Sequence, residues 1–336
     1  MKVLSISIAA YNAASTLREC LDPFLKSNVL KELDIMVVDD GSGDNTAEIA
    51  EEYHALYPDT FRLIKKENGG WGSTVNTGIK EAKGMYFKQL DSDDYYEPEA
   101  LNKFIEYLKT NPSDLVIAPY ITYDSDSGKV ITTEDCNPGC KLLKEYQIKD
   151  VPEFGPFMHS LSIKTKLLQN GNVKVTEHCF YTDTEFVLKA CNQAQTISFF
   201  DMPLYYYRRA AVGQSMSLSG FEKHYMEQYK VIEVSLDYLK NNVKRPEIKK
   251  IFDKLLFGTC FWQYLIMFYI SVSAEHKANL VKYDCMLKEK APDYYNNIHF
   301  KELDILRKTK FFGYSVLAHH KKKKDNRFTE DGKLAN

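Results

Sequence analysis

The sequence predicts an α/β fold in which helices flank a mostly parallel sheet, followed by a mainly helical C-terminal region. Two observations support this fold class. Over residues 1–118, short apolar strand patterns alternate with helical patterns, a rhythm typical of β-α-β units with parallel strands. From about residue 219 to 310, apolar residues recur mainly at helical spacing.

The elements of the first 118 residues follow in chain order. Apolar runs predict strands at residues 2–8, 33–39, 60–67, 85–91 and 114–119. Helical patterns separate them at about 14–27, 44–56, 72–83 and 98–110, and Asp44 is the expected N-cap of the second helix. Because parallel sheets bind ligands at the carboxyl ends of their strands, the residues after each strand are the first candidates for a site.

Beyond residue 120 the alternation of strands and helices weakens. The stretch YITYDSDSGKVITTED predicts a hairpin that turns around Asp126, Ser127 and Gly128. A helix near 181–193 and a strand near 195–207 follow it. The later helical region ends in a basic segment, HHKKKKDNR.

Composition and charge exclude several classes of protein. With 336 residues, 44% of them hydrophobic, the chain can bury a sizeable core, which excludes a disordered or collagen-like chain. Its net charge of −2 supplies no overall field that would attract nucleic acid. Seven scattered cysteines without a signal peptide predict a cytoplasmic protein, and CNPGC at 136–140 predicts free thiols at a turn rather than a zinc site.

The segment LLFGTCFWQYLIMFYISVSA, residues 255–274, carries no charge and is long enough to span a bilayer. Gln263, several hydroxyl side chains and lysine-rich flanks favour a buried helix of the C-terminal region, and a membrane span is the alternative. Together with HHKKKKDNR, this helix suggests peripheral contact with the anionic inner face of the cytoplasmic membrane; a solvated tail is the competing interpretation.

Three aspartates stand directly behind the fourth predicted strand, in KQLDSDDYYEP. Like charges at the end of a buried strand repel one another and are costly to desolvate, so a bound cation is the expected compensation. Asp91 and Asp93 flank one residue and can both address one divalent ion, and carboxylate oxygens suit Mg²⁺ or Mn²⁺. For this motif by itself, an acidic loop at the start of the next helix is an equal alternative.

The second and third predicted strands end in polar or glycine-rich loops. Asp39 and Asp40 emerge from an apolar run, and carboxylates there can accept hydrogen bonds from a base or ribose. The loop NGGWGSTVNTG at 68–78 is flexible enough to approach a ligand closely, although a plain glycine-rich loop is the alternative. It matches neither G-x-G-x-x-G nor a Walker A sequence, which weakens the case for a nicotinamide enzyme or a P-loop kinase.

Five motifs together resemble family 2 glycosyltransferases, inverting enzymes with the Rossmann-like GT-A fold. They are SISIAAYNAASTLRECLDPFL, VVDDGSGDNT, NGGWGSTVNTGI, LDSDDYYEP and YTDTEF, in the order and spacing seen in that family over about residues 1–215. The resemblance implies a nucleoside diphosphate sugar as donor, a UDP-sugar above all. It also implies Mn²⁺ or Mg²⁺ as cofactor and a saccharide or lipid-linked acceptor, in bacterial cell-surface polysaccharide synthesis.

The same resemblance implies the organisation of the chain and the roles of its acids. We expect a catalytic domain over 1–215, a helical region on the acceptor or membrane side over 216–318, and a basic, flexible tail over 319–336. Asp91 and Asp93 match the metal-binding pair of the family, with Asp94 as an adjoining acid. Asp183 falls where the family places its general base.

The donor-binding residues are likewise implied by position. They are Ala10, Tyr11, Asn12, Asp39, Asp40, Asn68, Gly69, Asn76, Asp91, Ser92, Arg208, Arg209 and Gln214. Two positions depart from the family pattern. Val75 stands where an Arg often precedes the Asn, and Thr182 stands where a Glu usually precedes the catalytic Asp.

These residues predict a single displacement with inversion at the anomeric carbon. Metal bound by Asp93 and Asp91 neutralises the departing diphosphate, and a carboxylate such as Asp183 takes the proton of the acceptor hydroxyl. His159 and His178 are further site candidates without an assigned role. The alternative is a non-catalytic nucleotide-sugar or carbohydrate-binding protein of the same fold, which has no need of a general base.

Overall fold

The computed structural model describes residues 1–125, 127–209 and 217–324. The chain divides into two compact units. The first consists of residues 1–209 and 245–251, and the second of residues 210–244 and 252–336. All the candidate site residues within the described ranges belong to the first unit.

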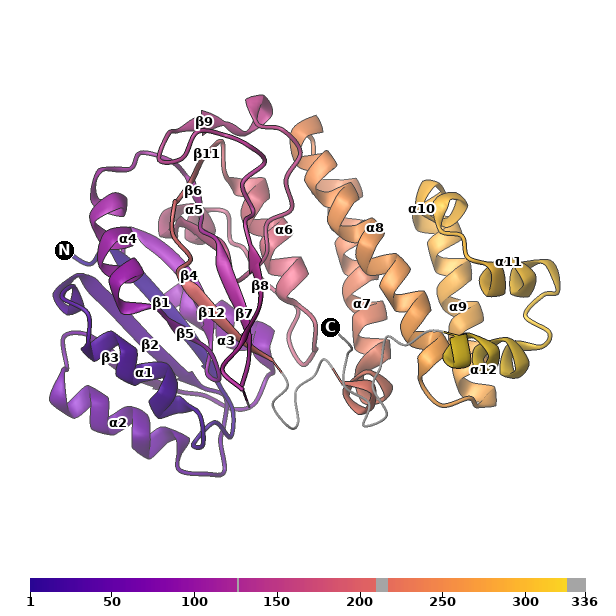
Figure 1. Cartoon of the computed structure of the whole chain (residues 1–336), viewed down its shortest axis with the longest axis horizontal. Coiled ribbons are helices and arrows are strands. Elements are labelled where there is room, and N and C mark those ends of the chain that lie inside the picture. Colours follow the sequence, from indigo (N-terminus) through magenta and orange to yellow (C-terminus); the bar gives the residue numbers. More distant parts are fainter. Residues whose placement is uncertain (126, 210–216, 325–336) are drawn as a thin grey trace. The chain divides into compact units, whose positions relative to one another are not determined.

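A large sheet forms the centre of the first unit (Figure 1). Within the described residues its strand order is β3-β2-β1-β4-β10-β6-β11-β9. The strands are β1 Leu4–Ala10, β2 Leu33–Asp39, β3 Phe61–Lys65, β4 Tyr86–Asp91, β6 Leu115–Ile117, β9 Tyr146–Gln147, β10 Leu161–Lys164 and β11 Thr196–Phe199. The first four in the chain pair in parallel, which confirms the predicted mostly parallel sheet.

The strand β10 is a feature that the sequence pattern did not predict. It lies between β4 and β6 and runs antiparallel to both. As a four-residue strand it is too short to show a period, and its Ser162 interrupts the apolar run although the residue is buried. Its position beside β4 brings the residues that precede it close to the end of that strand.

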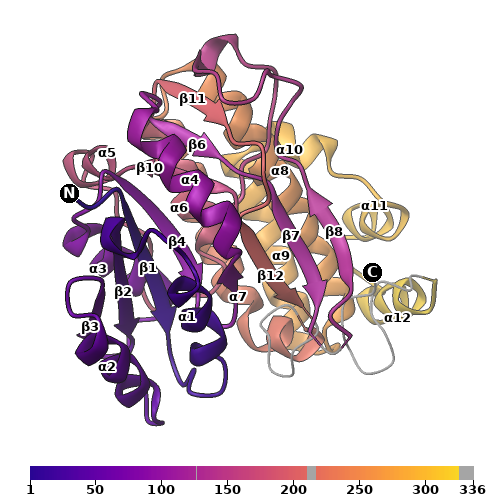
Figure 2. The same ribbon diagram turned by 60° about the vertical axis from the view of Figure 1, so that its left-hand side comes forward.

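Helices cover both faces of this sheet (Figure 2). On one face lie α1 Leu17–Leu25, α2 Thr46–Leu56 and α4 Pro98–Thr110; on the other lie α3 Trp71–Glu81, α5 Thr165–Asn170 and α6 Asp183–Gln193. Phe24 of α1 packs edge-on against Phe61, and Phe186 of α6 packs in the same way against Phe87. Coverage of both faces explains why all seven residues of β2 are buried and read as an apolar run.

The helix α2 begins two residues later than predicted, so Asp44 is not its N-cap. The N-cap position belongs to Asn45, whose side chain makes no capping hydrogen bond. The carboxylate of Asp44 instead accepts hydrogen bonds from the backbone N–H of Thr46 at 3.1 Å and from that of Ala14 at 3.1 Å. Asp44 therefore joins the start of α2 to the loop that follows β1.

A smaller sheet has the order β5-β12-β7-β8 in the described part of the chain. Its strands are β5 Tyr95–Tyr96, β7 Tyr120–Asp124, β8 Val130–Glu134 and β12 Tyr205–Arg209. The antiparallel pair β7–β8 is the predicted hairpin. The single strand predicted over 195–207 is wrong, because β11 ends at Phe199 and β12 starts at Tyr205, with Pro203, which has no N–H for a ladder, between them.

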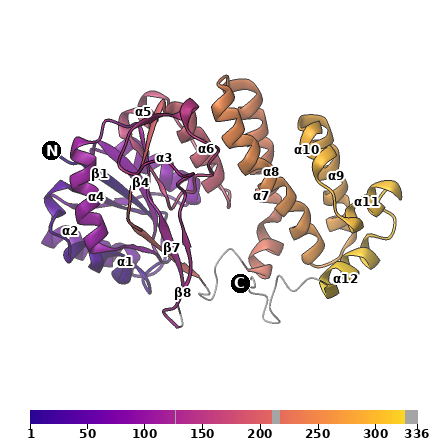
Figure 3. The same ribbon diagram turned by 45° about the horizontal axis from the view of Figure 1, so that its top comes forward.

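The second unit is helical in its described residues (Figure 3). Its helices are α7 Leu218–Asn242, α8 Pro246–Tyr269, α9 Ala274–Lys290, α10 Pro292–Asn297, α11 Lys301–Lys308 and α12 Tyr314–Lys324, of which α8 contributes its residues up to Ile251 to the first unit. Residues 319–324 of the expected tail lie in α12, and 325–336 lie outside the described residues.

By length and composition, α8 is a candidate membrane span, and 56% of its most apolar window is buried inside the protein. Two of its buried polar side chains form hydrogen bonds within the helical unit. Nε2 of Gln263 donates to the backbone carbonyl of Tyr225 at 2.9 Å, and the hydroxyl of Tyr264 donates to Asp284 at 2.7 Å. Burial with such internal hydrogen bonds is typical of the core helix of a helical domain.

Candidate active site

Three of the predicted site residues meet at one edge of the large sheet. In the parallel register, Ala10 of β1 is the partner of Asp39 of β2, and Ala9 is the partner of Asp91 of β4. The carboxyl ends of the three strands therefore lie at the same edge of the sheet, with Asp39 and Asp91 one register position apart.

Asp91 is the last residue of β4, and its surroundings raise the pKa of its carboxyl group. Its Oδ1 accepts a hydrogen bond of 2.7 Å from Nε1 of Trp71, at the start of α3. Burial, followed by the negative charge of Asp93, raises the pKa of Asp91 to about 7, while the hydrogen bond from Trp71 opposes this rise. An oriented carboxylate whose charge is disfavoured in the free protein is well suited to a bound cation.

The neighbouring acid Asp94 has a structural role. Its Oδ2 accepts a 2.6 Å hydrogen bond from the hydroxyl of Tyr205, and its Oδ1 accepts one of 2.6 Å from the backbone N–H of Arg208. Both donors belong to β12, so the buried carboxylate holds that strand against the loop after β4. Asp93, by contrast, forms no hydrogen bond or ion pair through its side chain within the described ranges, and its half-buried carboxylate is free to bind a ligand.

His159 is brought to the same place by the tertiary structure. It lies two residues before β10, and its ring packs against the rings of Tyr205 and Tyr207, with centroid distances of 4.8 and 4.5 Å. One ligand atom each of Asp91, Asp94 and His159 lie within 4.8 Å of one another. Burial, assisted by the charge of Lys88, lowers the pKa of His159 to about 3, so its imidazole is neutral.

Asp40, predicted to contact the nucleoside, organises the glycine-rich loop. Its carboxylate accepts hydrogen bonds from the backbone N–H groups of Gly69 at 3.0 Å and Gly70 at 2.8 Å, and it forms a 2.6 Å ion pair with Lys66. Gly70 has a φ of +78°, a left-handed conformation that favours glycine. The buried aspartate thus sets the shape of the loop, and a direct contact with a nucleoside stays a prediction.

Hydrogen bonds connect most of the remaining predicted residues in the loops that follow the strands. Asp39 accepts from the backbone N–H of Ser42 at 3.0 Å, and the amide oxygen of Asn12 accepts from Gly43 at 2.8 Å. Asn68 donates to the backbone carbonyl of Asp40 at 3.0 Å. Tyr11 is 56% exposed, an aromatic side chain that is open to a ligand.

Asn76 pins α3 to the segment that leads toward Asp183. Its Nδ2 donates to the backbone carbonyl of Val175 at 2.9 Å and to Glu177 at 2.9 Å, and its Oδ1 accepts from the backbone N–H of Val175 at 2.8 Å. Val75, where the family often has Arg, is fully buried in the core. Gly72 sits so close to this segment that an added Cβ would lie 2.1 Å from the carbonyl oxygen of Thr176.

Asp183 is the first residue of α6, and its side chain is accessible. Surrounding protein atoms still displace water from the carboxylate and so raise the pKa of Asp183. Its charge also contributes to raising the pKa of Asp91, so the two carboxylates act on each other electrostatically. Trp71, the donor to Asp91, packs edge-on against Phe186 of α6 at 6.4 Å, which connects the two parts of the site.

Glu185, two residues after Asp183, is the acid of this helix that cannot serve as a base. It is buried, accepts hydrogen bonds from the backbone N–H and the hydroxyl of Thr176, and pairs with Lys189 at 2.6 Å. It therefore fastens α6 to the segment that precedes it.

Two arginines and a histidine complete the predicted set. Arg208 pairs with Glu19 of α1, and Arg209 lies half-buried at the end of β12. His178 is exposed, and its backbone N–H donates to the carbonyl of Gly69 at 2.5 Å. Ser92 lies half-buried between Asp91 and Asp93, and Gln214 lies outside the described residues.

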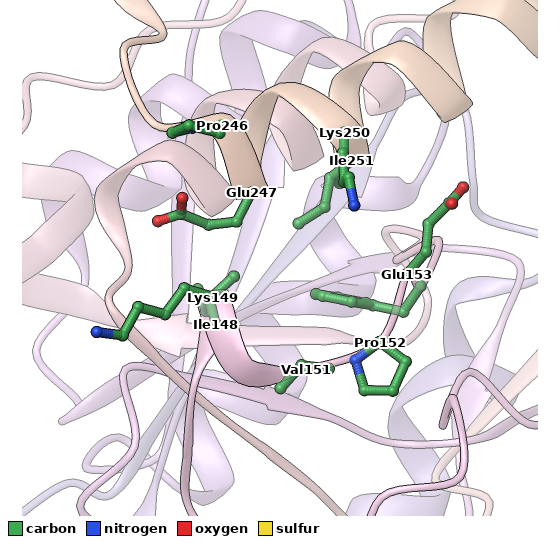
Figure 4. A pocket seen from close by; sticks show the side chains of 10 residues that line it. Ile148, Lys149, Val151, Pro152, Glu153, Pro246, Glu247, Lys250 and Ile251 are labelled. Carbon is green, nitrogen blue, oxygen red and sulfur yellow. The ribbon is translucent and has the colours of Figure 1, made fainter.

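Two cavities of the first unit are not lined by the acids at the strand ends. One of about 310 Å³ is lined by residues 148–154 and by the start of α8, where Lys149, Glu153 and Lys250 place charged groups around an apolar floor (Figure 4). Another, of about 600 Å³, lies between α3 and α5 and includes Asn76 in its lining. The acids of the strand ends line neither cavity.

The fold is that of the GT-A type, and in this chain one group of carboxylates ends the strands while a separate carboxylate begins α6. Residues 5–168 match the sequence profile of glycosyl transferase family 2. Residues 5–168 form a family 2 glycosyltransferase domain, and the protein is a transferase, as its motifs indicated.

Individual relatives agree with this assignment. The putative glycosyltransferase EpsH of Bacillus subtilis (strain 168) is 28% identical over 261 residues, which cover 75% of this chain and 74% of EpsH. The poly(ribitol-phosphate) beta-glucosyltransferase of Bacillus spizizenii is 31% identical over 221 residues, 64% of this chain and 34% of that protein. The crystal structure of S. aureus TarS 1-349 in complex with UDP-GlcNAc superposes on this chain with a TM-score of 0.71. The two sequences are 20% identical, and the superposition covers 97% of this chain and 93% of the TarS chain. This likeness shows the fold.

Proposed function

We propose that this enzyme transfers a sugar, with inversion, from a UDP-sugar to a hydroxyl group of a saccharide or lipid-linked acceptor in cell-surface polysaccharide synthesis. The observation that carries the proposal is the pairing of Asp91 with Asp183. One carboxylate is fixed at the end of a buried strand, the other is accessible at the start of α6, and each lies within the electrostatic reach of the other. The TarS structure with the same fold binds UDP-GlcNAc.

The residues at the end of β4 fit a divalent cation, Mn²⁺ or Mg²⁺. Asp91 and Asp93 are the carboxylates that would hold it, because Asp94 is already hydrogen-bonded through both oxygens. When bound, such an ion stabilises the negative charge that develops on the departing diphosphate. Arg208 and Arg209 lie on β12, which Asp94 fastens to this loop, and are the side chains we assign to the diphosphate oxygens.

Asp183 is suited to the role of general base. Its accessible carboxylate can accept a proton from an acceptor hydroxyl, and its raised pKa makes it a stronger base than an aspartate of ordinary pKa. It removes the proton of the acceptor hydroxyl as that oxygen forms the new bond to the anomeric carbon, while the bond from this carbon to the diphosphate breaks on the opposite face. The product carries the inverted configuration.

The donor class is tested by calorimetric titration of the protein with UDP, GDP and CDP, each with and without Mn²⁺. We expect metal-dependent binding of UDP and its loss in Asp93→Ala. Equal binding of UDP with and without metal contradicts the metal assignment, and tighter binding of GDP or CDP contradicts the donor assignment.

The base is tested by measuring sugar transfer from the UDP-sugar that the protein binds. Asp183→Asn is expected to lower turnover by roughly 10²–10⁴-fold while UDP affinity is retained. The matched control is Asp201→Asn, an exposed acid of the same unit, which should transfer normally. Nucleotide binding without transfer in the wild type would favour the non-catalytic binding protein.

We assign catalysis to residues 1–215 of this cytoplasmic enzyme and acceptor or membrane contact to residues 216–318. Support for the second assignment comes from Phe312 and Val316, which are 80% and 73% exposed around the start of α12, a helix whose last turn is rich in lysine. Exposed apolar side chains near lysines suit an anionic bilayer surface. Flotation with anionic vesicles should recover the wild type and lose a Phe312→Ser/Val316→Ser variant, and no recovery of the wild type contradicts the assignment.

A further inference from the structure

His159 occupies a position that its surroundings hold from several sides. Lys88, fully buried on β4, donates through Nζ to the backbone carbonyls of His159 at 2.7 Å and Leu161 at 3.2 Å. The imidazole packs edge-on against the ring of Tyr205, with an interplanar angle of 81°, and at a tilt of 36° against the ring of Tyr207. The backbone and the ring are both fixed beside the acids at the end of β4.

The nitrogen Nδ1 of this ring is buried without a hydrogen-bond partner among the described residues. A buried polar atom without a partner costs about 1–3 kcal/mol, so such an atom in a native protein calls for a specific explanation. Nδ1 differs in this respect from the hydroxyl of Tyr205 and from Nζ of Lys88, which lie close to it and have partners. The hydroxyl of Tyr205 has a hydrogen bond to Asp94, and Nζ of Lys88 has two carbonyl acceptors.

Two carboxylates lie close to His159, because Asp91 and Asp94 each have an oxygen within 4.8 Å of a nitrogen of its ring. Asp94 uses both of its oxygens to hold β12. Asp91 has only Oδ1 engaged, by Trp71, and its other oxygen accepts no hydrogen bond within the described part of the chain. Asp91 is therefore the carboxylate that can share a ligand with His159.

The separation suits two ligands of one ion. Atoms bound at about 2.1 Å to an octahedral ion lie about 3 Å apart on adjacent positions and about 4.2 Å apart on opposite ones. The upper bound of 4.8 Å between the ligand atoms of Asp91 and His159 includes both values. Since the second oxygen of Asp91 and Nδ1 of His159 both lack a hydrogen-bond partner among the described residues, one ion bound between these two side chains would give each a ligand bond.

We propose that His159 supplies a nitrogen ligand to the divalent ion that Asp91 and Asp93 bind. The inference deepens the proposed function and rests on its metal dependence. A nitrogen ligand favours a transition-metal ion, because imidazole coordinates these ions readily whereas Mg²⁺ prefers oxygen ligands. The enzyme should accordingly prefer Mn²⁺ to Mg²⁺, and His159 is the residue that sets this preference.

Pulsed electron paramagnetic resonance of Mn²⁺ bound to the enzyme with UDP tests the coordination directly. The wild type is expected to show hyperfine coupling from a coordinated ¹⁴N, which changes to ¹⁵N coupling when the histidines alone are labelled with ¹⁵N. His159→Gln should lose the histidine coupling, and His178→Gln, the exposed histidine nearby, should keep it. Circular dichroism confirms that each variant is folded.

Titration of the metal in the presence of UDP gives a second measurement. His159→Gln should weaken Mn²⁺ binding by at least about tenfold and leave Mg²⁺ binding nearly unchanged, so the preference between the ions shrinks. If the wild type binds UDP with Mn²⁺ and transfers sugar but shows no histidine nitrogen coupling, the inference is wrong and the proposed function stands. If the wild type shows no metal-dependent UDP binding, both are wrong.

Discussion

Replacement of Lys88 by Met tests how burial beneath the active site affects a charged group. The side chain is completely buried, and its Nζ donates to two backbone carbonyls that precede and begin β10. Burial lowers the pKa of Lys88 from 10.5 to about 7. The ammonium form that prevails in the unfolded chain is therefore disfavoured in the folded protein at neutral pH.

The sign of the effect follows from proton binding. Between pH 7 and 10.5 the unfolded chain holds a proton on Lys88 that the folded protein has released, so stability rises with pH across this window. A shift from 10.5 to about 7, at about 1.4 kcal/mol per pH unit, corresponds to a total of about 5 kcal/mol. About 3–4 kcal/mol of this total is recovered between pH 7 and pH 10.

The assay is urea unfolding of the wild type and Lys88→Met at several pH values from 7 to 10. The unfolding free energy of the wild type minus that of the variant should rise by about 3–4 kcal/mol over this range. Lys65→Met, at an exposed lysine of the same sheet, controls for the loss of one positive charge. A difference that stays constant with pH would refute the reasoning, because Lys88 would then be charged in the folded protein.

Two further predictions concern the glycine-rich loop. Trp71→Phe keeps an aromatic ring near α6 but removes the hydrogen-bond donor to Asp91. Calorimetry should therefore find that the variant binds Mn²⁺ about tenfold more weakly than the wild type. Unchanged Mn²⁺ binding would show that this hydrogen bond does not orient the carboxylate. Gly72→Ala places a Cβ against the carbonyl of Thr176 and should cost about 1–3 kcal/mol, seen as a lower Tm together with slower transfer. Gly258→Ala, a helical glycine with open space around it, should leave Tm equal or higher, and a similar loss in both variants would contradict the steric explanation.

Local patterns were sufficient for the elements of the β-α-β half. The fourth predicted helix, 98–110, agrees with α4, and the second predicted strand agrees with β2. These elements are long enough to show the repeat of apolar residues that is typical of a helix or a strand, and turn residues mark their ends. The errors lie where tertiary contacts overrule the pattern, as at Asp44, which joins α2 to another loop, and at Pro203, which divides the expected strand into β11 and β12.

The candidate site was predictable in its acids and not in its supporting contacts. Asp91 and Asp93 could be found because like charges crowd the end of an apolar strand. The hydrogen bond from Trp71 to Asp91 could not, since it joins residues that are twenty positions apart through the packing of α3 beside β4. The assignment of Asp40 to loop geometry likewise depends on contacts with Gly69 and Gly70 that no spacing rule predicts.

The sequence by itself determined the fold class through strand periodicity and turn residues, and charge crowding indicated Asp91 and Asp93. The resemblance of its motifs to a known family added Asp183, and all of these patterns are local properties of the chain. Only the tertiary structure decided which of these acids are free and which neighbours they have. Both carboxylate oxygens of Asp94 accept hydrogen bonds from β12. His159 lies close to Asp91 because the short strand β10, which follows this histidine, pairs antiparallel with β4. The physical reason is that hydrogen-bond satisfaction and burial are set by residues distant in the chain, which meet only when the sheet is assembled.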